Sequence, residues 1–507
     1  MDVTVAKTDC TEFKAPLLAV KIFQDEPELI GPVAKLDDKM GGAISEVIRR
    51  GDFAGREGQT SLLYPASGAI AAERVLLVGL GPRSDLDLEK LRRAAGTAVK
   101  EAMKLRVGGL ASLLHHAELV ADRISPEAAG RAVAEGAVLA AYTFREMKSG
   151  PGEGEPPIVE LSDFVVLEKK EQKAAEIEKG VRTGSIIARA ENRARDLGNL
   201  PGNVATPSYL AETAERIAKQ HGMKCTVLGR KELEKEGLET LLTVSRGSDQ
   251  EPKLIVIEHQ GGKKGDKPLV LLGKGLTFDA GGISIKPANG MEDMKFDMSG
   301  GAAVIGAMQG IGELDVAANV VGIIPSSENL LSGSAMKPGD IIRSHLGKTI
   351  EVVNTDAEGR LILADALSYL RRFEPAAVVD AATLTGACVV ALGHQVTALL
   401  GNNDGLLNEV RAAGERSGEK VWPLPMPADY KDLLKSDYAD IKNSGGRAAG
   451  TITAAWFLRE FVGDFPWAHL DVAGTAYGDG KLSYQAKGST GVPTRIFVEW
   501  VLARAGM

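Results

Sequence analysis

Cysteine is scarce in this sequence of 507 residues, in which Cys10, Cys225 and Cys388 are the only three. Three widely spaced thiols supply neither a disulfide framework nor a thiolate metal cluster. Long apolar runs are also missing, because no segment approaches the roughly 18 continuous apolar residues of a membrane span. The first residues hold no basic segment followed by a long apolar run, so we predict no signal peptide. These absences favour a protein of the reducing cytoplasm without a membrane partner.

Basic residues do not dominate either, because 60 Lys and Arg face 68 Asp and Glu, for a formal net charge of -8. Such a charge repels nucleic-acid phosphates and anionic membranes unless a local basic patch overrides it. The composition therefore argues against nucleic acid as a primary partner. The length allows two or three domains, each with a sizeable core.

Several familiar catalytic motifs are absent. The seven histidines include no His-Glu-x-x-His pair, and no Gly-x-Ser-x-Gly elbow occurs. The stretch VGLGPRS, residues 78–84, lacks the third glycine of a dinucleotide-binding loop, and a tight strand-to-helix turn accounts equally well for its two glycines. We therefore expect neither a histidine-based zinc site, nor a serine hydrolase, nor a nucleotide site.

The first third of the chain alternates strand-like apolar runs, such as residues 74–80, with helical periodicity at residues 87–105 and 126–144. This alternation predicts a layered α/β domain. The Gly, Pro and Glu cluster of residues 149–157 predicts a flexible surface loop. Residues 168–200 then read as one long helix that is charged on most faces, which suits a bridge between domains.

We therefore expect a smaller, macro-like N-terminal α/β domain at residues 1–168, a linking helix at 169–195 and a larger catalytic domain at 196–507. In the larger domain, continuous Val, Ile and Leu runs such as residues 267–275 alternate with helical stretches such as residues 300–314. This pattern predicts a mostly parallel central sheet covered by helices on both faces. Sites in such sheets gather outside the carboxyl ends of the strands.

The stretch NTDAEGR, residues 354–360, lies where an expected strand at residues 349–356 gives way, through an expected turn from Thr355 to Gly359, to an expected helix. In an extended segment, Asp356, Glu358 and Arg360 would project to one side. Arg360 also stands at the N-terminus of the helix, where the helix dipole disfavours a cation by up to about 1 kcal/mol. We infer that a negative partner nearby requires this arginine.

A second charged cluster lies upstream at the end of another apolar run, beside Gly281 and Gly282. Acids that meet from two strand ends would repel one another severely in a low-dielectric cleft, so cations must compensate them. The compensation is either a structural ion-pair network or a pair of divalent ions, because oxygen ligands suit Mg, Mn or Zn. The residues concerned are the acids Asp279, Asp297, Asp356 and Glu358 and the bases Lys274, Lys286 and Arg360.

The motifs GKGLTFDAGGISIKP, NTDAEGR, NLPGNVATP and NSGGRAAGTITAAWFL closely resemble those of the leucine aminopeptidase family. These dinuclear metallo-aminopeptidases are also called cytosol aminopeptidases or aminopeptidase A. The resemblance covers essentially the whole larger domain, whereas the first third is similar only in its α/β alternation. It implies a metal-dependent exopeptidase, a leucyl aminopeptidase that releases N-terminal amino acids from short peptides.

The resemblance also implies the roles of the charged residues. Asp279 and Glu358 would bridge two divalent ions, Mn or Zn with Mg or Co as alternatives. Lys274, as a neutral amine, and Asp297 would complete the shell of one ion, and Asp356 that of the other. Lys286 would polarise the scissile carbonyl. Arg360 would hold a bicarbonate-like anion that acts as general base on a water shared by the two metals.

A pocket for the first side chain is implied as well, and the small Ala476 suggests broad acceptance with a preference for apolar residues such as Leu. The family assembles as homohexamers, dimers of trimers, which we expect here. The alternative function is a DNA-binding accessory factor on the same scaffold. The implied pocket residues are Met294, Thr383, Leu384, Gly386, Ala473 and Ala476.

Overall fold

The computed structural model describes residues 1–25, 28–115, 124–150 and 159–507. The chain forms two compact units, which we call the N-terminal unit (Met1–Arg189 with Gly480–Ala486) and the C-terminal unit (Ala190–Asp479 with Lys487–Met507). The loop predicted at residues 149–157 falls mostly outside the described residues. None of the described helices is both long and apolar enough to cross a membrane.

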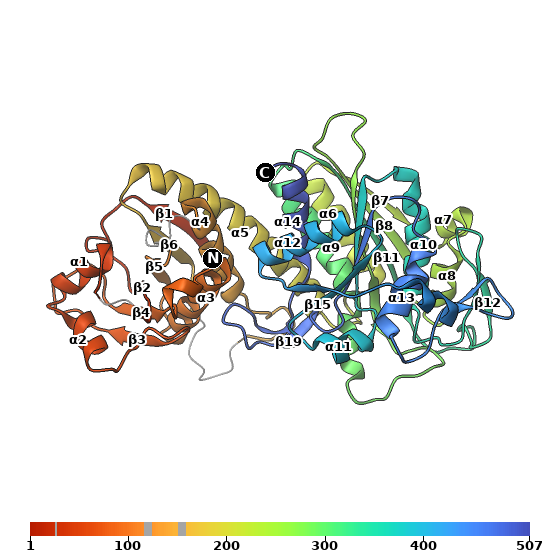
Figure 1. Ribbon diagram of the computed structural model, residues 1–507, viewed down its shortest axis with the longest axis horizontal. Helices are drawn as coiled ribbons and strands as arrows, with labels where there is room; N and C mark the ends of the chain where they lie inside the picture. The colour runs from red at the N-terminus through yellow and green to blue at the C-terminus, as the bar shows by residue number, and fades with distance from the viewer. Residues whose placement is uncertain (26–27, 116–123, 151–158) are drawn as a thin grey trace. The chain divides into compact units, whose positions relative to one another are not determined.

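The N-terminal unit contains a six-stranded sheet in the order β1-β6-β5-β2-β4-β3. All its pairs are parallel except the antiparallel pair of β3 and β4. Figure 1 shows this unit in red to yellow. Its strands are β1 (Asp2–Ala6), β2 (Leu18–Ile22), β3 (Thr60–Leu63), β4 (Val75–Gly79), β5 (Gly109–Ser112) and β6 (Asp163–Leu167), and its helices α1 (Gly31–Lys39), α2 (Ala43–Arg49), α3 (Leu88–Lys104) and α4 (Pro126–Ala140).

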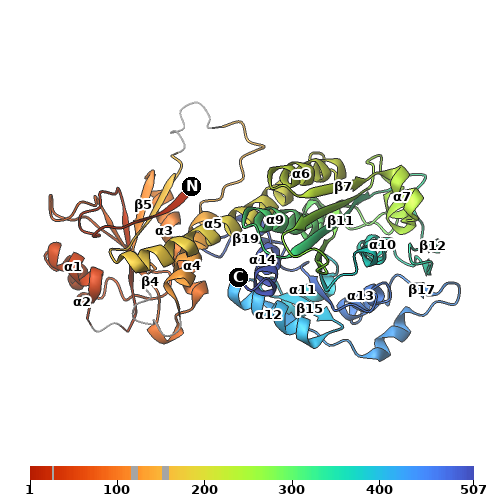
Figure 2. The same cartoon turned by 90° about the horizontal axis from the view of Figure 1, so that it is seen from above.

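Helix α5 (Glu171–Asn199) is one continuous helix of 29 residues that passes from one unit to the other (Figure 2). The predicted linking helix at residues 169–195 therefore corresponds to most of α5. The strands β19 (Tyr477–Asp479) and β20 (Lys487–Ser489) form a hairpin in the C-terminal unit. The tip of this hairpin, Gly480–Ala486, belongs to the N-terminal unit, so the chain passes between the units twice more. The functional division at residues 168 and 195 remains a prediction.

The C-terminal unit contains a nine-stranded sheet in the order β16-β15-β18-β14-β9-β11-β8-β7, with β10 paired to β11. Five of its strand pairs are parallel and three are antiparallel. The strands are β7 (Lys224–Leu228), β8 (Lys253–Gln260), β9 (Leu269–Gly273), β10 (Gly275–Asp279), β11 (Asn319–Asn329), β14 (Ala377–Ala382), β15 (Thr397–Gly401), β16 (Val421–Pro423) and β18 (Trp467–Asp471). A smaller sheet joins β12 (Ile341–Arg343), β13 (Thr349–Glu351) and β17 (Ile441–Lys442).

Helices cover both faces of the large sheet (Figures 1 and 2), which confirms the predicted fold class. One layer contains α6, α9, α12 and α14, and the other contains α8, α10 and α13. The helices of this unit are α6 (Pro207–Gln220), α7 (Arg230–Glu236), α8 (Glu239–Ser245), α9 (Ser299–Glu313), α10 (Gly359–Tyr369), α11 (Gly386–Leu392), α12 (Asp404–Ser417), α13 (Gly450–Arg459) and α14 (Thr494–Arg504).

The central strands are buried on both faces, as their unbroken apolar sequences predict. Every residue of β9 and β14 is buried. Two glycines let helix α9 start directly against the sheet, because a Cβ on Gly273 would lie 2.2 Å from the Gly300 carbonyl oxygen and one on Gly300 2.1 Å from that of Ala381. The same packing brings the residues that follow these strands to one edge of the sheet.

Candidate functional site

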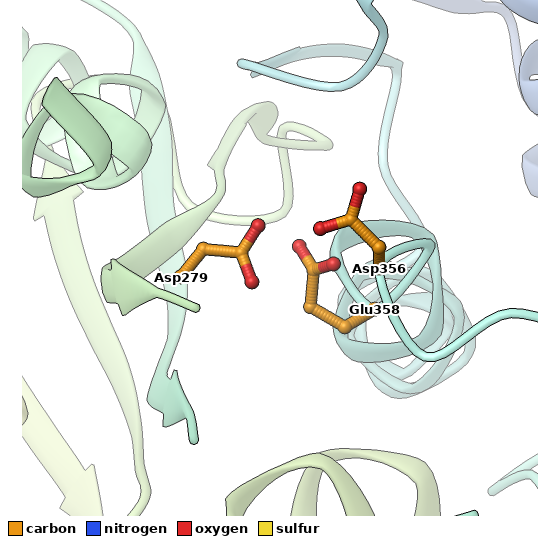
Figure 3. Close-up of side chains that lie close together, drawn as sticks. All are labelled: Asp279, Asp356 and Glu358. Atoms are coloured by element: carbon orange, nitrogen blue, oxygen red, sulfur yellow. The ribbon is translucent and has the colours of Figure 1, made fainter. Parts of the chain in front are cut away.

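Three carboxylates converge at this edge of the large sheet. Asp279 is the last residue of β10, while Asp356 and Glu358 precede helix α10. One oxygen from each lies within 4.8 Å of the others, and Figure 3 shows the three groups pointing toward one another. Asp279 and Glu358 are buried and Asp356 is partly exposed. Such a cluster of oxygen atoms can surround a small hard cation.

The turn predicted from Thr355 to Gly359 and the helix after it are present, but the strand before them is shorter than predicted. Strand β13 ends at Glu351, a turn contains Asp356, and Glu358 already has helical backbone angles of φ -77° and ψ -34°. The prediction that Asp356, Glu358 and Arg360 share one side of an extended segment is therefore wrong. A turn followed directly by a helix start directs the three side chains into one cavity instead.

A hydrogen-bond network fixes the position of Asp279. Its Oδ1 accepts from the backbone N–H of Gly281 (2.9 Å) and from Nδ2 of Asn329 (2.8 Å), and the same Nδ2 lies 3.0 Å from the Thr355 carbonyl oxygen. Thr355 Oγ1 in turn donates to the Gly281 carbonyl oxygen at 2.6 Å. Gly281 has a φ of +85°, which glycine adopts without strain. The network thus ties the end of β10 to the turn that carries Asp356.

Lys274 follows β9 and is buried among acids. Its Nζ lies 2.8 Å from Asp297 Oδ2 and 3.0 Å from Glu358 Oε1, and it donates to the Thr383 carbonyl oxygen at 3.0 Å. Burial lowers the pKa of Lys274, but the charges of Asp297, Glu358 and Asp279 outweigh burial and leave its pKa above the ordinary value. Without a metal, Lys274 is therefore an ammonium ion that neutralises the acids around it.

Lys286 approaches the same acids from the more open side. Its Nζ lies 2.7 Å from Asp279 Oδ2 and 2.5 Å from Asp356 Oδ1. Burial lowers the pKa of Lys286, but Asp279, Glu358 and Asp356 raise it above its ordinary value. This lysine is a cation at any physiological pH.

Two of the buried acids, Glu358 and Asp297, have raised pKa values. Burial, reinforced by the charge of Asp279, raises the pKa of Glu358 to about 8 and that of Asp297 to about 6. Thr383 Oγ1 donates to Asp297 Oδ1 at 2.6 Å, whereas Glu358 Oε2 is buried without a hydrogen-bond partner among the described residues. Four acids face three cations here, so the site carries uncompensated negative charge when all groups are ionised.

Arg360 occupies the first turn of α10 and is buried. Its Nη1 donates to the Asn443 carbonyl oxygen at 3.0 Å, while Nε has no hydrogen-bond partner among the described residues. Burial lowers the pKa of Arg360 to about 10, so the side chain remains charged at neutral pH. Asn443 also donates from Nδ2 to the Asn354 carbonyl oxygen at 2.7 Å, which anchors the turn before α10.

These groups line a cavity of about 930 Å³. Five of the six residues predicted for the first side chain line it, but Ala476 is fully buried and does not. A small side chain at position 476 therefore does not enlarge the cavity directly. Phe296 and Tyr477 form a stacked aromatic pair in the wall, with ring centroids 4.8 Å apart and an interplanar angle of 11°. The five predicted residues are Met294, Thr383, Leu384, Gly386 and Ala473.

Several known proteins are similar to this chain in sequence and in fold. The models of the cytosol aminopeptidase family match the chain at residues 192–498 (catalytic domain) and 19–151 (N-terminal domain). The probable cytosol aminopeptidase of Geobacter sulfurreducens is 45% identical over 503 residues, which cover 99% of each chain. That of Nitrosococcus oceani is 46% identical and covers 96% of this chain and 95% of the relative.

The chain belongs to the cytosol aminopeptidase family. It is a leucyl aminopeptidase, a metal-dependent hydrolase that removes N-terminal residues from peptides. A tomato leucine aminopeptidase variant superposes on it with a TM-score of 0.88 at 33% identity, covering 99% of this chain and 96% of the other. The bottromycin maturation enzyme BotP, solved in complex with Mn, superposes with a TM-score of 0.84 at 35% identity, covering 97% and 100%.

The residues of the aminopeptidase fit divalent cations on chemical grounds. The donor set consists of carboxylate oxygens, which hard cations prefer, and one buried oxygen, Glu358 Oε2, has no hydrogen-bond partner among the described residues. Lys274 could join as a ligand only after losing its proton, because an ammonium ion has no lone pair. Its short contacts with Asp297 and Glu358 show that its Nζ already lies among the donor atoms.

Sequence reasoning missed the residues that hold the aminopeptidase's charged groups in place. Asn329, Thr355 and Asn443 are short polar residues inside apolar or turn segments. Each fixes a functional residue, or the turn beside it, through hydrogen bonds that involve a side chain. A buried Asp471 acts similarly, because its Oδ1 accepts from the N–H groups of Leu384 (3.1 Å) and Ala473 (3.2 Å). In the sequence, Asn329 and Asp471 could have been found as polar residues at the carboxyl ends of apolar strands.

Proposed function

We propose that this aminopeptidase binds two divalent ions at the converging carboxylates. Asp279 and Glu358 would bridge the ions, Lys274 and Asp297 would complete one shell, and Asp356 would complete the other. The observation that carries the proposal is the convergence of three carboxylates within 4.8 Å, two of them buried. Mn or Zn fits this donor set, with Mg or Co as alternatives.

When bound, the ions supply Lewis-acid polarisation of the scissile carbonyl and activate a shared water molecule as the nucleophile. Lys286 keeps its proton and presents a positive charge to the oxygen of that carbonyl, where negative charge develops during attack. Its raised pKa and its partial exposure toward the cavity support this role.

Arg360 is proposed to hold a small anion such as bicarbonate, which would take a proton from the nucleophilic water. Charge balance supports this assignment. Two divalent ions would offset the four carboxylates, so Lys286 and Arg360 would remain as surplus positive charge. The unpartnered Nε of Arg360 also offers a donor that no described residue accepts.

The substrate is proposed to be a short peptide with a Leu-like N-terminal residue. The side chain of that residue would contact Met294, Leu384 and Ala473, which give the cavity an apolar wall. Thr383 and Gly386 line the cavity beside them, and buried Ala476 would act only by supporting the wall. Equal turnover of Leu, Asp and Pro N-terminal substrates would contradict an apolar preference.

We further propose a cytoplasmic homohexamer, a dimer of trimers, that does not depend on nucleic acid. The net charge of -8 opposes DNA binding. Size-exclusion chromatography with light scattering tests the assembly. Retardation of DNA in a gel shift at low salt would instead support the accessory-factor alternative.

The deciding experiment is hydrolysis of leucine amide by protein stripped of metal and then resupplied with Mn or Zn, alongside Lys286→Ala. We expect no activity without metal, recovery with metal, and a loss of about a hundredfold or more in kcat for the variant, the usual size for a group that stabilises developing charge. Electron paramagnetic resonance of added Mn provides a readout that does not depend on turnover. Activity that survives complete chelation would overturn the proposal.

A further inference from the structure

One side of the cavity is formed by the loop between β17 and α13. Ser444, Gly446, Arg447 and Ala449 of this loop all line the cavity. The loop starts at Asn443, whose Oδ1 accepts from the Val353 N–H at 2.9 Å and whose carbonyl oxygen contacts Arg360. The loop is therefore fixed to the turn that carries the reactive groups.

The other end of the loop holds strained backbone. Ala449 has a φ of +50°, a left-handed conformation that costs a non-glycine residue of order 1 kcal/mol and persists only where surrounding structure imposes it. Among the four described non-glycine residues with positive φ, Ala449 is the one that lines the cavity. Backbone strain of this kind clusters at active sites and at loops that hold ligands.

Arg447 differs from the other cations of the cavity. Lys274 contacts Asp297 and Glu358, and Lys286 contacts Asp279 and Asp356. Arg360 is bound to the Asn443 carbonyl oxygen. Arg447 is exposed at the cavity surface and makes no hydrogen bond or ion pair with any described residue. A planar guanidinium that lines a substrate cavity without a protein partner is free to bind one from the substrate.

We propose that Arg447 binds the terminal carboxylate of a dipeptide or tripeptide substrate. A short peptide has a cationic amine at one end and a carboxylate at the other, and Asp293, an acid of the same cavity outside the proposed metal ligands, repels the carboxylate. The guanidinium offers paired N–H donors that match a carboxylate. Arg447 would thus make the enzyme prefer short peptides with a free C-terminus over longer or blocked ones.

This inference rests on the proposed aminopeptidase site, and its test separates the two. Hydrolysis of Leu-Gly, which has a free carboxylate, is compared with that of Leu-glycinamide, which is identical but uncharged at that end. The measured quantity is the ratio of the two kcat/KM values in the metal-loaded wild-type enzyme and in Arg447→Gln, Arg447→Lys and Arg447→Glu. Lys267→Gln removes one exposed positive charge before β9, outside the cavity, and serves as the electrostatic control.

We expect Arg447→Gln to lower the acid-to-amide ratio about three- to fivefold, the range of an exposed ion pair. Arg447→Lys should recover part of the ratio, Arg447→Glu should lower it further, and Lys267→Gln should match the wild type. The wild-type ratio should also fall as salt rises from about 0.01 M to about 1 M, because the Debye length shrinks from about 30 Å to about 3 Å.

An Arg447→Gln ratio equal to that of the wild type, or a salt-independent wild-type ratio, would overturn the inference. An equal fall in both kcat/KM values would overturn it too, because Arg447 would then serve the site as a whole. If neither substrate is hydrolysed by the wild-type enzyme with metal, the proposed function itself has failed.

Discussion

Glu135 in the N-terminal unit and Glu358 in the C-terminal unit are both buried, but their carboxylates are partnered differently. In the N-terminal unit, Arg92 Nε lies 2.5 Å from Glu135 Oε2, and Arg131 Nε lies 2.9 Å from the other oxygen of the same carboxylate. In the C-terminal unit, Glu358 leaves one buried oxygen unpartnered among the described residues, and its pKa rises to about 8. A buried acid with a cation at each oxygen is costly to unpair, whereas buried acids in excess of the cations around them indicate a candidate ligand site.

The largest effect is expected when one acid of the metal site in the C-terminal unit is removed. Asp279→Ala should abolish Mn binding and lower kcat/KM at least about a thousandfold, because loss of metal forfeits several kcal/mol of transition-state stabilisation. Electron paramagnetic resonance with Mn and a leucine amide assay measure the two effects. Near-normal turnover by this variant would place the chemistry elsewhere.

The matching change in the N-terminal unit is Glu135→Gln. It leaves the buried guanidinium of Arg92 without its nearest counter-charge, which should lower the free energy of unfolding of this unit by about 3 kcal/mol. All four tryptophans lie in the C-terminal unit, so the loss is measured by circular dichroism or proteolysis, with tryptophan fluorescence as the internal control. A wild-type unfolding curve would show that the pair is dispensable.

A smaller effect concerns pH. The folded-state pKa values of Glu358 (about 8, against 4.5) and Asp297 (about 6, against 3.8) are raised mainly by burial. Their contribution to stability is therefore fully present below about pH 4 and is lost as pH rises through about 6 and about 8.

Without metal, the tryptophan-detected melting temperature should thus fall from pH 5.5 to pH 8.5, by about 2–4 °C for each kcal/mol lost. Added Mn should reverse the trend, because ligands must be deprotonated to bind it. A metal-free melting temperature that rises over this range would contradict the assigned burial of the acids.

The sequence was sufficient for the parts of the fold that follow from periodicity. Unbroken apolar runs predict β9 and β14, and the strand-end rule predicts where Lys274 and Asp279 gather. The sequence predicts the turn at residues 355–359 but not the end of the strand before it, because the apolar Val352 and Val353 extend the strand pattern past Glu351, where β13 ends. Local sequence periodicity carries no information about long-range hydrogen bonds, such as those of the Asn443 side chain with the backbone of Val353 and Asn354.

The sequence also did not predict which side chains after β18 line the cavity. Ala476 stands close in sequence to Ala473 and Tyr477, which line the cavity, yet its own side chain is fully buried. The direction of each side chain after β18 depends on the turn held by Asp471, which no local pattern specifies.

The hairpin of β19 and β20 limits where this enzyme can be truncated. Its tip, Gly480–Ala486, packs within the N-terminal unit, where Tyr484 is fully buried and its hydroxyl lies 2.9 Å from Glu89 Oε1. A fragment that began in α5 would lack Glu89 and the rest of the core around Tyr484, and it would therefore expose that tyrosine to water. Truncation libraries should keep the N-terminal unit together with residues 480–486.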